Sequence, residues 1–146
     1  MTWFWQRWTG DGRAMLKFAL KLDGVASSLL GLLTVLIRPE VGMPTGWQIG
    51  LGLFCVVYGV LVFALGTREV PDRRIVLLVV IGNLAWALDS VLTAELKWFP
   101  LTGVGVALVL AQGLAVLGFA VLQFIGLRSA TSATGRGTRP RSPSLA

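Results

Sequence analysis

The stretch IVLLVVIGNLAWALDSVLTA, residues 75–94, decides the fold of this chain. It can cross a bilayer, because a membrane-spanning helix needs about 20 mostly apolar residues. At 100° per residue, its polar and amphipathic side chains fall within roughly a 120° arc of one helix face. These side chains are Asn83, Trp86, Asp89, Ser90 and Thr93. The pattern therefore predicts a membrane helix with a polar stripe.

A polar stripe on a membrane helix has to avoid lipid, because a charge at the bilayer centre costs at least about 2.5 kcal/mol. We therefore expect Asn83, Trp86 and Asp89 to face the interior of a helix bundle or an oligomer interface. The opposite face is expected to tolerate exchanges among apolar residues. It consists of Leu77, Val80, Leu84 and Val91.

The composition of the whole chain agrees with a membrane protein. Of its 146 residues, 55% are hydrophobic and the mean hydropathy is +0.76. Only 14% are charged, against about 25% in a typical soluble domain. These values exclude an ordinary soluble protein, and the length allows one bundle of spans without a separate soluble domain.

Three further apolar stretches, 16–37, 47–66 and 101–127, predict three more spans. The chain is thus expected to be an all-α four-helix transmembrane bundle over residues 16–127, with short loops and up-down-up-down topology. Residues 1–15 hold three tryptophans, which favours an interfacial segment. Residues 128–146 are rich in Ser, Thr, Gly, Pro and Arg and are expected to form a disordered basic tail.

The positive charges predict the orientation. The formal net charge is +6, and of the 13 Lys and Arg residues only Arg38 and Lys97 fall in the first and third loops. Because cytoplasmic loops carry the excess of Lys and Arg, both termini are expected in the cytoplasm, with the chain in the inner (plasma) membrane. The same distribution argues that the bilayer, rather than nucleic acid, is the partner of these charges.

Each predicted span contributes one polar side chain at a similar depth. With a rise of 1.5 Å per residue, Asp23, Tyr58, Asn83 and Gln123 lie very roughly 8–12 Å inside the cytoplasmic ends of their spans. Asp89 lies elsewhere, in the outer third of its span. The sequence therefore predicts a cytoplasm-side polar cluster and a separate outer carboxylate. The candidate polar core consists of Asp23, Tyr58, Asn83, Trp86, Asp89, Gln112 and Gln123.

The role of these residues has two interpretations. An intramembrane acid such as Asp23 or Asp89 is a candidate proton or cation site. Asp23 also sits two residues from Lys21, which is typical of an ordinary interfacial ion pair. The amide side chains can equally hydrogen-bond between helices or contact a ligand, and a tryptophan near mid-span, such as Trp86, more often packs than binds.

The residues for catalysis or metal binding are missing from the sequence. It contains no histidine, and its single cysteine, Cys55, lies inside an apolar run, where it is expected to pack as an apolar residue. No nucleophile–base motif is present. We therefore expect no enzymatic activity, no cofactor and no metal.

Two stretches, LKLDGVASSLLGLL from Leu20 and GNLAWALDS from Gly82, resemble small four-span bacterial integral membrane proteins of uncharacterised function. The resemblance implies a bacterial inner-membrane location and no activity. Small multidrug transporters have the same size and span number, but they share a glutamate within the first span. Here the first span carries only Asp23, near its end.

Two functions follow as hypotheses. The first is a non-enzymatic accessory or interaction subunit, or a binder of a lipid-like small molecule, with a membrane-protein partner or a homo-oligomer. Its motivation is the small-residue stripes, such as Gly52, Gly59 and Gly66, which let helices approach closely. The alternative is a small proton- or ion-coupled transporter that uses Asp89 or Asp23.

Overall fold

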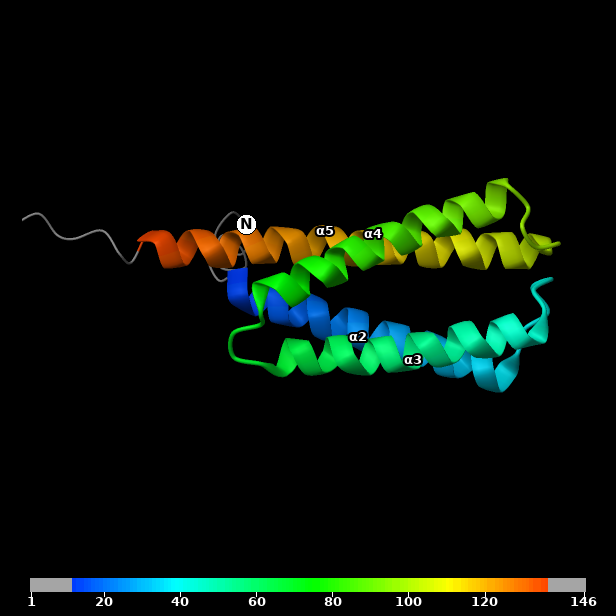
Figure 1. Cartoon of the computed structure of the whole chain (residues 1–146), viewed down its shortest axis with the longest axis horizontal. Helices are drawn as coiled ribbons and strands as arrows, with labels where there is room; N and C mark the ends of the chain where they lie inside the picture. The colour runs from blue at the N-terminus through cyan, green and yellow to red at the C-terminus, as the bar shows by residue number, and fades with distance from the viewer. Residues whose placement is uncertain (1–11, 137–146) are drawn as a thin grey trace, which may run out of the picture.

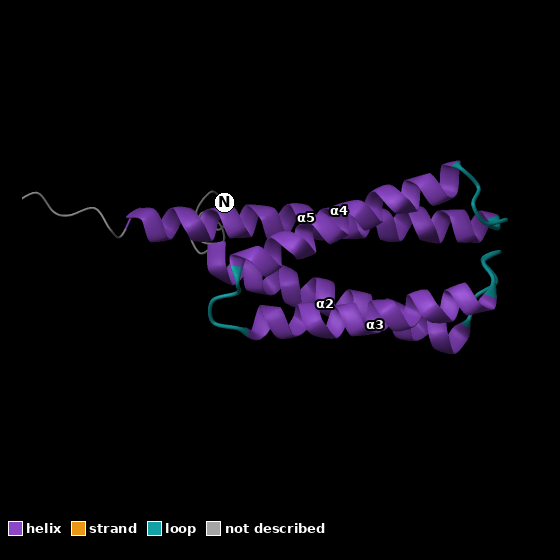
Figure 2. Cartoon of the chain, viewed as in Figure 1, coloured by secondary structure: helices purple, strands orange, loops and turns teal. Residues whose placement is uncertain are grey.

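A computed structural model describes residues 12–136, with side chains as far as Ser132. It forms a bundle of four helices, α2 (Gly12–Ile37), α3 (Thr45–Thr67), α4 (Arg73–Glu95) and α5 (Gly103–Arg136), with no strand in this part of the chain (Figures 1 and 2). All four helices are long and apolar enough to cross a membrane. The Trp-rich segment before Gly12 and the last ten residues lie outside the described residues.

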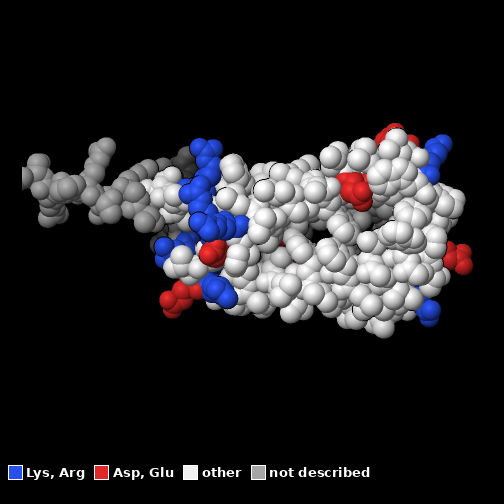
Figure 3. All heavy atoms as spheres, viewed as in Figure 1, with Lys and Arg blue, Asp and Glu red and all other residues white. Residues whose placement is uncertain are grey.

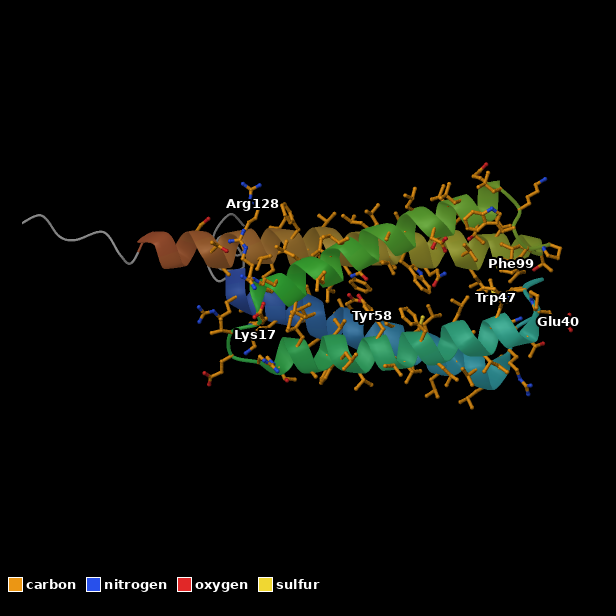
Figure 4. All side chains as sticks on the ribbon, viewed as in Figure 1. Lys17, Glu40, Trp47, Tyr58, Phe99 and Arg128 are labelled. Carbon is orange, nitrogen blue, oxygen red and sulfur yellow. The ribbon has the colours of Figure 1, made fainter. Side chains whose placement is uncertain are left out.

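The helices are arranged as two pairs, α2 with α3 and α4 with α5, and α2 also packs against α5 (Figure 1). The loops after α2 and after α4 lie at one end of the bundle. They are joined there, because the Thr102 amide donates to the Val41 carbonyl at 3.0 Å and the Thr102 hydroxyl donates to the Glu40 carbonyl at 3.2 Å. Trp47 and Phe99 meet edge to face at the same end, with 5.6 Å between ring centroids (Figure 4).

Glycines let α2 and α3 approach until their backbones touch. A Cβ added at Gly24 would lie 2.6 Å from the Gly59 carbonyl oxygen, well inside van der Waals contact. Gly31 and Gly52 face each other in the same way farther along the two helices. The small-residue stripe of α3 is therefore used inside the chain, where it makes the α2–α3 contact the most extensive in the bundle.

Aromatic side chains fill the wider space between α3 and α4. The ring of Phe54 stacks on Trp86 with 5.8 Å between centroids and on Tyr58 with 6.2 Å. No small-residue contact brings these two helices together, and they approach less closely than the pairs named above. The α3–α4 seam is thus held by rings rather than by backbone packing.

The helix ends follow local chemistry. Asp72 caps α4, since its carboxylate accepts from the amides of Arg74 at 2.8 Å and Ile75 at 3.3 Å. α5 runs past residue 128, where the sequence predicted the start of a disordered tail. The helix continues to Arg136; the hydroxyls of Thr131 and Ser132 bond to carbonyls one turn earlier, and Gly12 of α2 packs against this part of α5.

The outer surface of the bundle is apolar and the buried core is small. Leu16, Leu20 and Val76 are at most 2% exposed and form the core near the end where α2 begins. Val80 belongs to this core and Leu77 packs against it, although the sequence placed both on a face open to apolar exchange. Both lie in the first part of α4, where the helix packs into this core, whereas Leu84 and Val91 of the same face lie farther along α4 and are exposed.

Candidate functional site

The candidate site is a polar cluster in the middle of the bundle, centred on Asp23 of α2. The Asp23 side chain is completely buried. Each of the other three helices contributes one polar side chain to it, namely Tyr58 from α3, Asn83 from α4 and Gln123 from α5. In Figure 4, Tyr58 points between the two helix pairs. The cluster therefore joins all four helices at one level.

The two oxygens of the Asp23 carboxylate have different partners. Oδ2 accepts three hydrogen bonds, from Gln123 Nε2 at 2.7 Å, from Asn83 Nδ2 at 2.8 Å and from the Tyr58 hydroxyl at 3.4 Å. Oδ1 accepts one, from the Ser27 hydroxyl at 3.0 Å. Ser27 lies on α2 one turn after Asp23, and the i, i+4 spacing brings the two side chains together.

The side chains that donate to Asp23 are also hydrogen-bonded to one another, which fixes their positions. The Tyr58 hydroxyl lies 2.6 Å from Asn83 Oδ1, so its main bond is to the amide and its contact with Asp23 is the weaker one. Asn83 Nδ2 also approaches Gln123 Oε1 at 3.2 Å. As a result, every polar atom of these side chains that is fully buried has a partner.

The charge of the cluster is not balanced by a nearby cation. Among the described residues Asp23 makes no ion pair, and Lys21, which the sequence offered as its partner, does not reach it. All four groups that bond to the carboxylate are neutral hydroxyls or amides. An ionised carboxylate that is buried in this way depends on hydrogen bonds alone.

The remaining predicted site residues lie outside the cluster. Trp86 is half-buried at the α3–α4 seam, where it stacks on Phe54. Gln112 is half-buried on α5 and makes none of the cluster's hydrogen bonds. Asp89 is exposed on α4, so within one chain it does not face the bundle interior as its place in the polar stripe suggested.

The wheel position of Asp89 explains this difference. The stripe spans about 120°, and Asn83 and Ser90 occupy one side of it, which is buried. Asp89 lies at the other edge of the arc, beyond Trp86 and the buried Thr93, and is exposed. A polar arc on a helix wheel therefore does not identify which of its edges meets a neighbour.

Two participants, Ser27 and Phe54, were missed as site residues from the sequence. Ser27 had a usable signal, since it follows Asp23 by four residues on the same helix face. Phe54 had none, because one phenylalanine in an apolar span looks like any other. Among the described residues no group of three or more His, Cys, Asp or Glu side chains could hold a metal ion.

No known protein family, curated protein or solved structure matches the chain. The resemblance drawn from the sequence is therefore shown only at the level of four apolar helices. Any function has to be argued from the residues described above.

Proposed function

We propose that this chain is a non-enzymatic multi-pass membrane protein that associates with another membrane protein through the outer flank of α4. The observation that supports this is Asp89, a carboxylate that is exposed on the surface of a membrane-capable helix. A charge that faces hydrocarbon costs at least about 2.5 kcal/mol, so we expect another protein to cover this surface in the membrane.

Asp89 lies too deep in the span for its carboxylate to reach water easily. It lies six residues before Glu95, the last residue of α4, which corresponds to about 9 Å along the helix axis. Cα–Cβ bonds in a helix tilt toward its N-terminus, so the short Asp89 side chain leans away from the nearer surface. Unlike a lysine, it cannot extend to the headgroups.

Small residues beside Asp89 allow a second helix to come close. Ala85 and Gly82 precede it by one and two turns, and all three are exposed. A Cβ added at Gly82 would meet nothing within 4 Å. This flank, formed by Gly82, Ala85 and Asp89, contains two small residues, and small residues let membrane helices approach closely.

The chemistry of the flank favours a partner helix with a basic side chain. A second copy of this chain offers no cation at the right depth, because its nearest described candidate at this end of α4, Lys97, lies eight residues after Asp89 and outside the helix, which ends at Glu95. We therefore expect a different membrane protein, with a Lys or Arg about two turns from the end of a span.

The proposal includes an orientation. Lys and Arg side chains gather at the end of the bundle where α2 begins (Figure 3), which supports cytoplasmic termini, up-down-up-down topology and an inner-membrane location. Reporter fusions after Gly42 and after Arg128 test this. Cytoplasmic activity of the Gly42 fusion would contradict the orientation.

Site-directed cross-linking in native membranes tests the association. A photoreactive side chain at Ala85 is expected to capture one defined membrane protein, with a basic residue in the cross-linked segment. Asp89→Asn should weaken the capture and Asp89→Glu should keep it. The matched control is the same probe at Leu114 of α5, which is 72% exposed. Equal, unselective capture at both positions, or capture of lipid alone, would refute the proposal.

A second candidate function, a small proton- or ion-coupled transporter, is favoured by one observation, the buried Asp23 cluster. Transport would require solute movement in proteoliposomes that Asp23→Asn abolishes. The flank on α4 would then serve assembly only, and Asp89→Asn would leave transport intact.

A further inference from the structure

We propose that Asp23 is a proton-binding site inside the bundle, which carries its proton on Oδ1 against the hydroxyl of Ser27. This inference is independent of the α4 flank, since it concerns a residue on another helix that is closed to the outside of the bundle. It follows from the unequal surroundings of the two carboxylate oxygens.

Two of the three partners of Oδ2 are the amide nitrogens Asn83 Nδ2 and Gln123 Nε2, which can donate a hydrogen bond but cannot accept one. The oxygen of each amide is also hydrogen-bonded, Asn83 Oδ1 to the Tyr58 hydroxyl and Gln123 Oε1 to Asn83 Nδ2. Neither amide can therefore turn over without losing a hydrogen bond. A proton placed on Oδ2 would face these N–H groups and break the pattern. The same N–H groups disfavour a metal cation at this oxygen.

The Oδ1 side can accept a proton by reversing one hydrogen bond. Its single partner is the Ser27 hydroxyl at 3.0 Å, and a hydroxyl can donate or accept by rotating its hydrogen. With Asp23 ionised, Ser27 donates to Oδ1. With Asp23 protonated, Oδ1 donates to the Ser27 oxygen. Oδ2 keeps its three bonds in both states.

The step is a simple proton transfer. A hydronium ion from the aqueous phase loses one proton and becomes water, an O–H bond forms at Oδ1, and the charge of the cluster changes from −1 to 0. The buried negative charge has no cation beside it in the described structure, so the membrane interior favours the neutral state. The hydrogen bonds to Oδ2 stabilise the ionised state. Each state is therefore stabilised by a different part of the surroundings.

The groups that face Asp23 are few. Tyr58 from α3 is titratable, whereas Asn83 from α4, Gln123 from α5 and Ser27 from α2 are neutral. Tyr58 and Ser27 are half-buried, whereas Asn83 and Gln123 are buried. We therefore expect protons to exchange with water past one of these two hydroxyl groups.

Infrared difference spectroscopy of the full chain in liposomes tests the site. The carbonyl stretch of protonated Asp23 is the band that wild type shows and Asp23→Asn lacks, because the other acidic residues of the chain also protonate at low pH and contribute to both spectra. This difference band should be present at low pH and disappear as pH rises. Asp89→Asn, which removes the other intramembrane carboxylate, is the control and should keep the band and its midpoint.

A second variant keeps the carboxylate and reads the same band. Gln123→Leu removes one donor to Oδ2, which weakens the ionised form. The midpoint of the band should therefore lie at higher pH than in the wild type. Tyr58→Phe should move it in the same direction by less, because the Tyr58 bond to Asp23 is long.

Three results would overturn the proposal. A band that is missing at all pH values would mean a permanent carboxylate with a purely structural role. A band that never disappears would mean a permanently neutral acid. A midpoint that shifts when Na⁺ replaces K⁺ would mean that a metal ion competes for the site, contrary to the donor set around Oδ2.

Discussion

Replacing Gly24 by alanine is expected to push α2 and α3 apart. The added Cβ would lie 2.6 Å from the Gly59 carbonyl oxygen and 2.7 Å from the backbone nitrogen of Phe63. Both are backbone atoms and cannot rotate away, so the helices themselves would have to separate. Separation would also pull Tyr58 of α3 away from Asp23, where their contact is already 3.4 Å long.

The size of the effect comes from two opposing contributions. Alanine is more favourable than glycine in a helix by about 0.5–1 kcal/mol. Overpacking typically costs about 1–3 kcal/mol, and a contact between backbones belongs at the upper end of that range. Gly82→Ala is the matched control, because a Cβ there meets nothing within 4 Å and brings only the favourable contribution. Gly24→Ala should therefore unfold more easily than the wild type, and Gly82→Ala should not.

Unfolding of the reconstituted protein in mixed micelles with increasing dodecyl sulfate, followed by helical circular dichroism, measures both variants. The expected difference in free energy of unfolding between them is about 1–3 kcal/mol. Equal midpoints for Gly24→Ala and Gly82→Ala would refute the backbone contact between α2 and α3.

Three further predictions use the same unfolding assay. Tyr58→Phe removes a hydroxyl but keeps the ring on Phe54, so it should lower the free energy of unfolding by only about 0.6–1.7 kcal/mol, as for other hydrogen bonds between membrane helices; a loss as large as that of Gly24→Ala would contradict this. Val80→Ala opens the core and should cost about 1 kcal/mol, whereas Leu84→Ala, at a side chain that is 45% exposed, should change little. Asp72→Ala removes the cap of α4 and should cost about 1 kcal/mol, while Asp72→Asn should restore most of it, because an amide oxygen also caps.

The spans were predictable from the sequence because hydropathy alone sets them. Three of the four expected spans lie within their helices, and the fourth, 101–127, begins two residues before α5. The other differences are also at the ends, where α2 begins at Gly12 and α5 continues to Arg136. Those ends depend on contacts between distant residues, such as Gly12 with Ser129, which hydropathy does not report.

The polar cluster was partly predictable from depth. One polar side chain per span at a common level, Asp23, Tyr58, Asn83 and Gln123, pointed to the four residues that the structure brings together. Depth says nothing about rotation around the helix axis, however. Gln112 and Asp89 therefore could not be assigned to the inside or the outside from the sequence, since that depends on which neighbours each helix meets.

The division of the cluster between the first two helices and the last two has a consequence for biosynthesis. A nascent chain that has inserted only α2 and α3 can already form its glycine contact, yet its Asp23 has only Ser27 and Tyr58 as partners. Asn83 and Gln123 arrive later, on α4 and α5. In the bilayer, the hairpin of α2 and α3 alone thus contains a carboxylate with too few hydrogen-bond partners. A truncated product is therefore expected to be less stable than the complete four-helix chain.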